Sequence, residues 1–332
     1  MKRGNNMNSQ PFYHLRPNKY IDRNLFLQTL IGLNQFAPIS EYQYTGFGSY
    51  LFDDFKLLHE ILNISTMISL EKDPVIYARA RFNCPYNCIE IRNEGSTEYL
   101  SSLSLTDTSH NIFWLDYTDP KSIGTQLADY SILLGKLNTK DIVRITLNAN
   151  PSTLGKSSKD ADELREKRLV KLQERVPNEF IPSMTTPDDL TKTHYPLLIL
   201  KILKNVAMDV LQGTKYEPNY LFPLFSSVYE DGQQMLTFTG IVLDKCEDET
   251  KIQDALQSHN HHSFSWDNPC SISIPALSIR ELYELNKILP SETAKEQLLH
   301  SFPFVFGRDG NFAVDSYISY YKHYPNFHQV NF

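Results

Sequence analysis

A glycine-rich turn and a later carboxylate are the first residues whose types and spacing could do chemistry. The turn is Thr45-Gly46-Phe47-Gly48-Ser49, and the carboxylate opens the pair Glu71-Lys72, 23 residues after Gly48. Glycines let the backbone pass close to a ligand, and an acid about 20 residues further on meets the hydroxyls of a ribose. The spacing therefore predicts an adenosine-like ligand, with these two segments as its binding residues.

The form of the turn selects among adenosine-like ligands. A pyrophosphate-binding turn carries a third glycine, and here Gly48 is followed by Ser49, Tyr50 and Leu51. The only other candidate, Gly155-Lys156-Ser157, lies in a polar stretch without the upstream glycine and strand of a phosphate-binding loop. S-adenosylmethionine, which has adenine and ribose but no phosphate, is the ligand that remains.

A second pair of residues, Asp116-Tyr117, ends an apolar run at 112–115 that is typical of a buried strand. Ligands of open α/β sheets collect outside the carboxyl ends of the strands, which makes this pair the leading catalytic candidates and Asp116 a cofactor contact as well. The carboxylate could accept a proton from an attacking hydroxyl or amine, and the ring could pack against a sulfonium or a flat substrate. Alternatively, Asp116 caps the next turn and Tyr117 is a packing residue.

The elements around these residues must bring them to one edge of a sheet. Apolar spacing and turn residues predict strands on either side of the glycine turn and at 88–92, 111–116 and 141–148, and helices at 52–62, 74–82, 98–105, 129–137 and 197–211. Asp231-Gly232 joins the strand-like runs 221–230 and 233–243, which is a hairpin signal. The predicted fold class is α/β, a Rossmann-like doubly wound sheet with a terminal antiparallel hairpin, a helical insertion and a C-terminal extension.

The order of these segments resembles a class I S-adenosylmethionine-dependent methyltransferase over roughly residues 12–245. The resemblance implies a seven-stranded sheet completed by the hairpin. It also implies that Glu94-Gly95-Ser96, after the third strand, lies against the adenine, although a surface turn would use the same residues. A helix ahead of the first strand would bring Lys19 to the methionine carboxylate of the cofactor; the alternative is that Arg16 and Lys19 are solvated charges.

The methyl acceptor is harder to predict. Amino-methyltransferases of nucleic acids usually carry Asp/Asn-Pro-Pro-aromatic at the end of the fourth strand, whereas here Asp116-Tyr117-Thr118 has no proline pair. The favoured hypothesis is therefore transfer to an oxygen of an unidentified acceptor by in-line displacement. An RNA or DNA methyltransferase is the first alternative, and a non-catalytic binding or regulatory subunit that keeps the fold, within a protein assembly, is the second.

Composition limits the partners. The 332 residues carry a formal net charge of −7, which argues against a broadly basic, nucleic-acid-binding surface. The mixed charges of 155–176 could form a local basic groove, but their spacing favours a solvated helix with internal ion pairs. No apolar run is long enough to cross a bilayer, and the amino terminus lacks a signal-peptide core, so a cytoplasmic protein without membrane contact is expected.

Cysteines and histidines give no metal prediction. Cys84 and Cys88 have one residue too many between them for the common zinc or redox pair, and there is no second pair. His259-Asn260-His261-His262 lies among polar residues, which favours a loop over a ligand set. The sequence therefore predicts no metal site.

The chain is predicted to comprise an N-terminal cofactor-side helical segment at 1–40, a methyltransferase-like core at 41–245 with an insertion at 152–192, and an extension at 246–332. In the extension, a polar connection follows residue 245, then a short strand at 271–275 and a helix at 278–288. Tyr317, Tyr320, Tyr321 and Tyr324 recur at helical spacing and would form one face. Packing against the main domain is favoured for that face over base stacking.

Overall fold

The computed structural model describes residues 16–106, 109–158, 160–212, 219–244, 246–258, 261–300, 302, 304 and 310–325. The chain divides into two compact units. The larger unit contains residues 25–228 and 232–271, and the smaller contains residues up to 24, 229–231 and those from 272 onward. The domain boundaries expected at residues 40 and 245 stay predictions.

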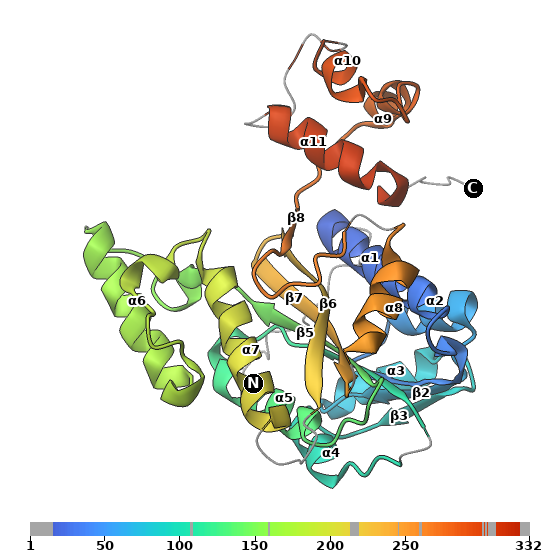
Figure 1. Ribbon diagram of the computed structural model, residues 1–332, viewed down its shortest axis with the longest axis vertical. Helices are drawn as coiled ribbons and strands as arrows, with labels where there is room; N and C mark the ends of the chain where they lie inside the picture. The colour runs from blue at the N-terminus through green and yellow to red at the C-terminus, as the bar shows by residue number, and fades with distance from the viewer. Residues whose placement is uncertain are drawn as a thin grey trace, which may run out of the picture. The chain divides into compact units, whose positions relative to one another are not determined.

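An eight-stranded sheet runs through the larger unit (Figure 1). Its strands are β1 (Gln43–Gly46), β2 (Thr66–Leu70), β3 (Ile89–Arg92), β4 (Asn111–Asp116), β5 (Ile142–Asn148), β6 (Tyr220–Glu230), β7 (Gln234–Leu243) and β8 (Cys270–Ile272). They lie in the order β3-β2-β1-β4-β5-β7-β6-β8. The order reverses between β1 and β4, and such a switch point is where open α/β sheets bind ligands.

The strand directions confirm the predicted fold class. Strands β1 to β5 run parallel to one another, and β7 runs antiparallel to β5. The hairpin between β6 and β7 turns at Asp231-Gly232, where Gly232 has a φ of 97°, a conformation that glycine adopts without strain. One difference is the eighth strand: β8 extends the expected seven-stranded sheet beside β6.

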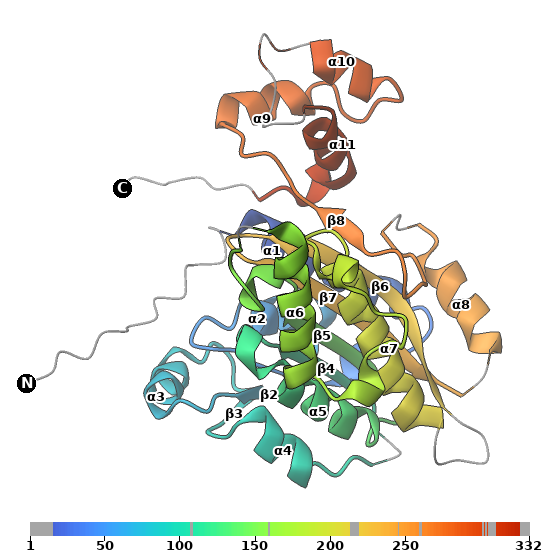
Figure 2. The same ribbon diagram turned by 90° about the vertical axis from the view of Figure 1, so that its left-hand side faces the viewer.

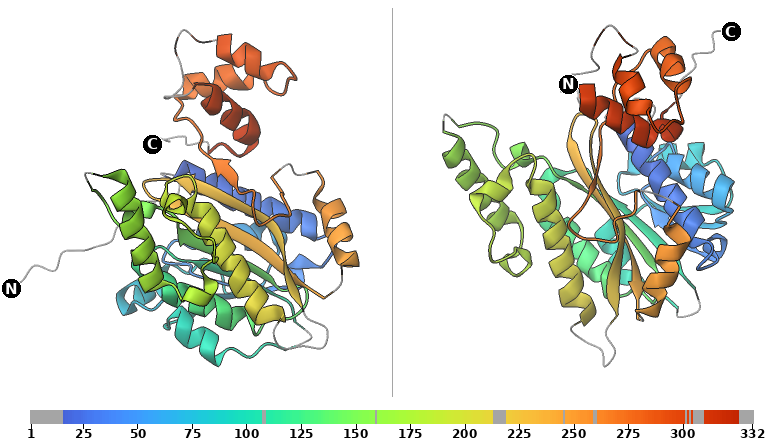
Figure 3. Two further views of the ribbon diagram at one scale, coloured as in Figure 1. Left: turned by 60° about the vertical axis from the view of Figure 1, so that its left-hand side comes forward. Right: turned by 45° about the horizontal axis from the view of Figure 1, so that its top comes forward.

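Helices cover both faces of the sheet, in accord with the continuous burial of β5. In the larger unit they are α1 (Pro17–Leu33, whose first residues belong to the smaller unit), α2 (Asp53–Leu62), α3 (Pro74–Asn83), α4 (Ser96–Ser102), α5 (Ile123–Leu134), α6 (Ala161–Arg175), α7 (Tyr195–Gln212) and α8 (Glu247–Leu256). On one face, Val143 and Ile145 of β5 pack in a core with α4, α5 and α7. On the other, Phe26 of α1 meets Trp114 edge-on at 5.4 Å. Figure 3 shows α1 and α7 on opposite sides of the sheet.

Short 3₁₀ turns lie between the main elements. They are η2 (Ile39–Glu41), η3 (Pro120–Ser122), η4 (Pro151–Thr153), η5 (Asn178–Phe180), η6 (Pro187–Leu190) and, in the smaller unit, η7 (Tyr321–His323). Two sequence expectations were wrong. Helix α5 begins at Ile123 instead of residue 129, and α8 replaces the polar connection expected after residue 245. Helix α8 buries Ile252 and Leu256, which are four residues apart and give too short a pattern to indicate a helix by themselves.

The insertion forms helix α6 and the turns that follow it. Arg165 pairs with Asp162, Lys167 with Glu163 and Lys171 with Glu174, so much of the charge of this helix is matched internally. The prediction of a solvated helix with ion pairs is therefore confirmed. At its end, the Arg175 guanidinium donates to the carbonyl oxygens of Pro120 and Thr153, which attaches α6 to the loops that follow β4 and β5.

The smaller unit gathers α9 (Ile279–Asn286), α10 (Ala294–His300) and α11 (Gly310–Tyr320), seen together in Figure 2. Tyr317 is buried in their core and meets Tyr324 edge-on at 5.6 Å, with Tyr321 packed beside it. The aromatic face is thus a packing face, and it packs within this unit. The Tyr324 hydroxyl also donates to the Pro275 carbonyl.

Candidate functional site

The glycine turn after β1 is packed closely on its inner side. The Gly48 amide donates to the Ser69 Oγ of β2 at 3.2 Å. A Cβ at Gly48 would lie 2.6 Å from that oxygen and 2.9 Å from the Phe52 ring, and a Cβ at Gly46 would lie 2.6 Å from the Tyr44 hydroxyl. A side chain at either position would push against these neighbours, so the packing of the turn favours glycine in addition to any ligand.

The second half of the turn leads directly into α2. Ser49 and Phe52 have φ angles of 51° and 54°, in the left-handed region that non-glycine residues adopt only at a cost. The buried Phe52 ring and a hydrogen bond from the Tyr44 hydroxyl to the Asp54 carboxylate hold this conformation. Asp54 lies in the first turn of α2, where the helix dipole favours a negative charge. The turn and the helix thus form one preorganised piece.

Glu71 follows β2 directly, as the sequence predicts. Its carboxylate is half-buried, and Oε1 accepts a hydrogen bond from the Asp73 amide at 2.9 Å. Burial raises the pKa of Glu71, and the Asp73 amide opposes that shift. The Asn93 side chain donates to the Glu71 carbonyl at 2.8 Å, which links the ends of β2 and β3. The carboxylate is therefore held at the carboxyl edge of the sheet.

The turn Glu94-Gly95-Ser96 lies beside the residues after β2. The nearest atoms to a Cβ at Gly95 are the Lys72 Cβ and a Glu98 oxygen, both at 4.0 Å, so a methyl group at this position would make ordinary contacts. Glu98 accepts a hydrogen bond from the Gly95 amide, which caps α4. The turn is thus held by this cap, and the packing around it does not force a glycine at this position.

The residues at the end of β4 show which acid caps the turn that follows this strand. Asp116 is half-buried and pairs in register with Thr146 of β5. The cap of the following turn η3 is Asp119, whose carboxylate accepts from the Lys121 amide and the Ser122 hydroxyl. The capping alternative considered for Asp116 therefore belongs to Asp119.

Tyr117 has contacts on both sides of its ring. Its hydroxyl donates to Oδ2 of Asp129 on α5 at 2.7 Å, and its ring meets Phe47 edge-on at 5.4 Å. Burial, then the nearby Asp129 charge, raises the pKa of the Tyr117 phenol far above its ordinary value. The phenol is therefore a hydrogen-bond donor to Asp129 and a poor proton acceptor.

Asn148, the last residue of β5, and Asn150 form the turn at the end of this strand. Asn148 Oδ1 accepts from the Asn150 amide, and Asn150 Oδ1 accepts from the Ser152 amide, both at 3.0 Å. The Asn150 side chain also donates to Gln233 at 3.2 Å. These contacts are typical of turn-forming asparagines.

The structure brings most of the predicted site residues to the carboxyl edge of β1 to β4. These are Thr45, Gly46, Phe47, Gly48, Ser49, Glu71, Lys72, Glu94, Gly95, Ser96, Asp116 and Tyr117. Lys19 belongs to the smaller unit, where it is buried and its backbone amide donates to Asp231 at 2.8 Å. Its contact with the cofactor stays a prediction.

Two residues of the site were missed by sequence reasoning. Ser69 is the residue before the end of β2, and its hydroxyl oxygen accepts a hydrogen bond from the Gly48 amide. A serine inside an apolar strand gives no distinct sequence signal. Asp129 accepts from three hydroxyl groups and lies in the middle of α5, between the buried Leu127 and Tyr130. A single acid on the apolar face of a helix was the available signal, and it was hidden because that helix was expected to start at this residue.

The candidate ligand clusters contribute no metal site in the part of the chain that the structure describes. No group of three or more His, Cys, Asp or Glu side chains there could hold an ion. His261 and His262 both contact the Thr29 hydroxyl, and His259 lies outside the described residues. None of the described helices combines the length and apolar character needed to cross a membrane.

Comparison with solved structures gives only distant likenesses. A Klebsiella pneumoniae protein, itself described as a "putative O-methyltransferase", matches with 9% identity over 69% of this chain and 88% of its own, at a TM-score of 0.36. TYW2 from M. jannaschii, in complex with AdoMet, matches with 9% identity over 68% and 77%, at 0.38. The match to a fibrillarin/Nop5p complex has 12% identity over 41% of this chain and 62% of that chain, at 0.28. At these TM-scores the likenesses carry no argument about substrate or partner.

Sequence comparison is more decisive. No curated protein matches the chain. The model of one protein family, described as "Putative O-methyltransferase", matches residues 11–332, which is nearly the whole chain. The chain therefore belongs to this methyltransferase family, which confirms the predicted resemblance to the class I S-adenosylmethionine-dependent methyltransferases.

Proposed function

We propose that this methyltransferase transfers its methyl group to an oxygen of an acceptor bound at the carboxyl end of β4. The observation that carries the proposal is the position of Asp116. Its half-buried carboxylate ends the strand next to the switch point, while Asp119 supplies the cap of the following turn. A carboxylate so placed is a suitable acceptor for the proton of an attacking hydroxyl.

The residues around the switch point fit S-adenosylmethionine. Glu71 offers a half-buried carboxylate to a pair of ribose hydroxyls, and the turn at Gly95, beside Lys72, would lie against the adenine. The described turns after β1 to β4 contain no Gly-Lys-Ser/Thr sequence to hold a phosphate. When bound, the cofactor supplies a methyl group already activated on a sulfonium.

The protein's own contribution is mainly orientation. Asp116 would hold the acceptor hydroxyl by its proton, and the Phe47 and Tyr117 rings would form an apolar wall that excludes water. Holding two reacting groups in line is worth up to about 7 to 11 kcal/mol in favourable cases. Tyr117 is assigned to the wall and not to proton transfer, because its hydroxyl donates to Asp129.

Cofactor binding is the first test of the proposal. Calorimetric titration with S-adenosylmethionine, S-adenosylhomocysteine and NAD should give saturable binding of the first two alone. Glu71→Ala should raise their Kd about tenfold or more, because it removes a charged partner of buried hydroxyls. Glu90→Ala is the matched control, since Glu90 is an exposed acid on β3 that pairs with Arg92. Equal effects of the two substitutions would remove the assignment of Glu71.

The acceptor is tested with labelled cofactor. Transfer of the labelled methyl group should be screened on hydroxyl-bearing aromatic compounds, carboxylic acids and RNA. Asp116→Asn should lower turnover about a hundredfold, the scale of a lost proton acceptor, with the cofactor Kd within about threefold. Transfer to RNA bases would support the nucleic-acid alternative, and cofactor binding without any transfer would support a non-catalytic role. Equal loss of binding and turnover would give Asp116 a cofactor-holding role.

A further inference from the structure

A buried carboxylate that the proposed chemistry does not use lies behind the site. Asp129 is on α5 and is only 1% exposed. Its Oδ2 accepts from the Ser96 hydroxyl at 2.6 Å and from the Tyr117 hydroxyl at 2.7 Å, and its Oδ1 accepts from the Thr97 hydroxyl at 2.7 Å. A carboxylate at this depth is tolerated only because its oxygens are well paired.

We propose that Asp129 is a positioning residue of the cofactor site, acting through Ser96 and Tyr117. This inference rests on the proposed function, because it gives those two residues their orientation toward the same ligand. One carboxylate connects Ser96, the first residue of α4, with Tyr117, the residue directly after β4. Through the contact of Tyr117 with Phe47, the connection reaches the glycine turn after β1.

The chemistry of the donors is what makes this a positioning device. All three are side-chain hydroxyls, which rotate about single bonds and have no fixed direction of their own. Because Ser96 and Tyr117 share one oxygen atom, their hydroxyls must converge on the same point. Without an acceptor there, Ser96, Thr97 and Tyr117 can each adopt other rotamers. The segments that follow β3 and β4 are then no longer joined through one carboxylate.

The decisive variants are Asp129→Ala and Asp129→Asn. The alanine should raise the Kd for S-adenosylhomocysteine about tenfold or more, since three hydrogen bonds to a charged group are lost. The asparagine should stay within about threefold of the parent, because an amide can donate to a hydroxyl oxygen as well as accept from a hydroxyl. If the alanine variant does not fold, Asp129→Leu, which fills the space without hydrogen bonds, carries the same expectation.

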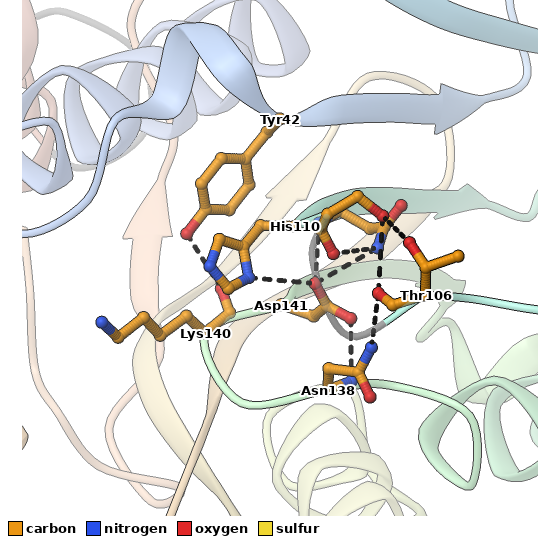
Figure 4. A network of polar contacts seen from close by, with 8 residues as sticks. Tyr42, Thr106, His110, Asn138, Lys140 and Asp141 are labelled. Carbon is orange, nitrogen blue, oxygen red and sulfur yellow. Dashed lines mark hydrogen bonds and ion pairs between the residues drawn. The ribbon is translucent and has the colours of Figure 1, made fainter.

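A matched control lies at the other end of the sheet. Asp141 precedes β5, is fully buried, and accepts from the backbone amides of Asn111 and Asn138 in the network of Figure 4. Asp141→Ala or Asp141→Asn should lower the thermal unfolding midpoint yet leave the Kd of the folded protein within about twofold, since the hydrogen bonds described for Asp141 lie at the amino end of the strands, away from the carboxyl edge. Equal weakening of binding by the Asp129 and Asp141 variants would show general destabilisation and overturn the proposal.

A double-mutant cycle tests the route through Tyr117. If Asp129 acts through that hydroxyl, the effect of Tyr117→Phe on Kd, up to about threefold in the parent, should disappear in the Asp129→Ala background. Strictly additive effects would overturn the route. Turnover at saturating cofactor should fall less than affinity, because the chemistry is assigned to Asp116.

The connection can also be measured without any ligand. Asp129→Ala, but not Asp141→Ala, should speed hydrogen exchange about tenfold at the amides of Tyr99 and Tyr117, which donate to Gly95 and Thr146. If the parent protein binds no S-adenosylhomocysteine, the proposed function fails, and faster exchange at these two amides still supports the positioning role. Unchanged exchange there overturns it independently.

Discussion

Two buried carboxylates, Asp129 and Asp141, hold opposite ends of the same region of the sheet. Asp129 connects residues that follow β3 and β4, and Asp141 connects the start of β4 with the loop before β5. Both are almost completely buried. They differ in their donors: Asp129 accepts from side-chain hydroxyls, whereas Asp141 accepts from backbone amides at 2.7 and 2.8 Å and from the Asn111 side chain.

The difference in donors separates two uses of one chemical group. Backbone amides point in directions set by the chain, so an acceptor placed among them joins loops and stabilises the fold. Hydroxyls point where their acceptor is, so an acceptor placed among them sets side-chain positions. Two further contacts join the loops around Asp141 (Figure 4). The Tyr42 ring lies 5.2 Å from the His110 ring, and the Tyr42 hydroxyl donates to the Lys140 carbonyl.

The largest expected effect separates the two acids by stability. Asp141→Asn should lower the free energy of unfolding by about 3 kcal/mol, because either orientation of the amide sets its NH₂ group against a backbone N–H that cannot reverse. Asp129→Asn should cost less than about 1 kcal/mol, because hydroxyls can accept from that NH₂ group. Urea unfolding of both variants measures the difference. Equal losses of unfolding free energy in the two variants would mean that the type of donor does not distinguish Asp129 from Asp141.

A second comparison uses two glycines of the carboxyl end. Gly48→Ala should cost about 2 kcal/mol and weaken cofactor binding, because its Cβ would press on Ser69 and Phe52. Gly95→Ala is the control: its neighbours are 4.0 Å away, and only a small capping loss, under about 1 kcal/mol, is expected. Unfolding and titration with S-adenosylhomocysteine check both. A tolerated alanine at Gly48 would mean that the turn is looser than its contacts indicate.

Much of the carboxyl edge could be predicted from sequence because its signals are local. The β-branched run of β5, the Asp231-Gly232 turn and the spacing from Gly48 to Glu71 each specify a short segment, and strand ends of a parallel sheet fall on one edge. Asp119 also had a local signal that was not used, since Pro120 follows it and an acid before proline is typical of a cap.

The parts that could not be predicted depend on contacts far apart in the chain. Asp129 is 33 residues from Ser96, and neither segment has a local sequence pattern that predicts a contact with the other. The joining of β8 to β6 is likewise a tertiary choice that a three-residue strand cannot express. The packing that favours glycine at positions 46 and 48 involves Tyr44, Ser69 and Phe52, so the sequence indicated the glycines but not this reason for them.

A smaller effect on stability is expected from pH, and it arises from Asp141 at the amino end of β5. Burial raises the pKa of Asp141 to about 6, above its value of about 3.9 in an unfolded chain. The folded protein therefore binds this proton more tightly, and the contribution to stability is complete below about pH 4 and lost as pH rises through 6. Its full size is about 3 kcal/mol, of which about 2 kcal/mol is lost between pH 4.5 and 7.5.

The measurement is the difference in unfolding free energy between the parent and Asp141→Asn from pH 4.5 to 7.5. The parent should gain on the variant as the pH falls. His110, whose Nδ1 lies 3.9 Å from Asp141, has a pKa lowered by burial and by Lys140, so its own contribution has the opposite sign. It is present in both proteins and largely cancels. A difference that is flat across this window would contradict the raised pKa.

The smallest expected effect decides the role of Tyr117. If its hydroxyl only orients the ring, Tyr117→Phe should leave turnover and cofactor Kd within about threefold and cost about 1 kcal/mol of stability, because Asp129 keeps two other donors. Tyr117→Ala, which also removes the contact with Phe47, should weaken binding further. A hundredfold loss of turnover in the phenylalanine variant, with binding intact, would instead make the phenol part of the chemistry. That result would join Asp129 to the reacting groups and remove the distinction drawn between positioning by Asp129 and proton transfer by Asp116.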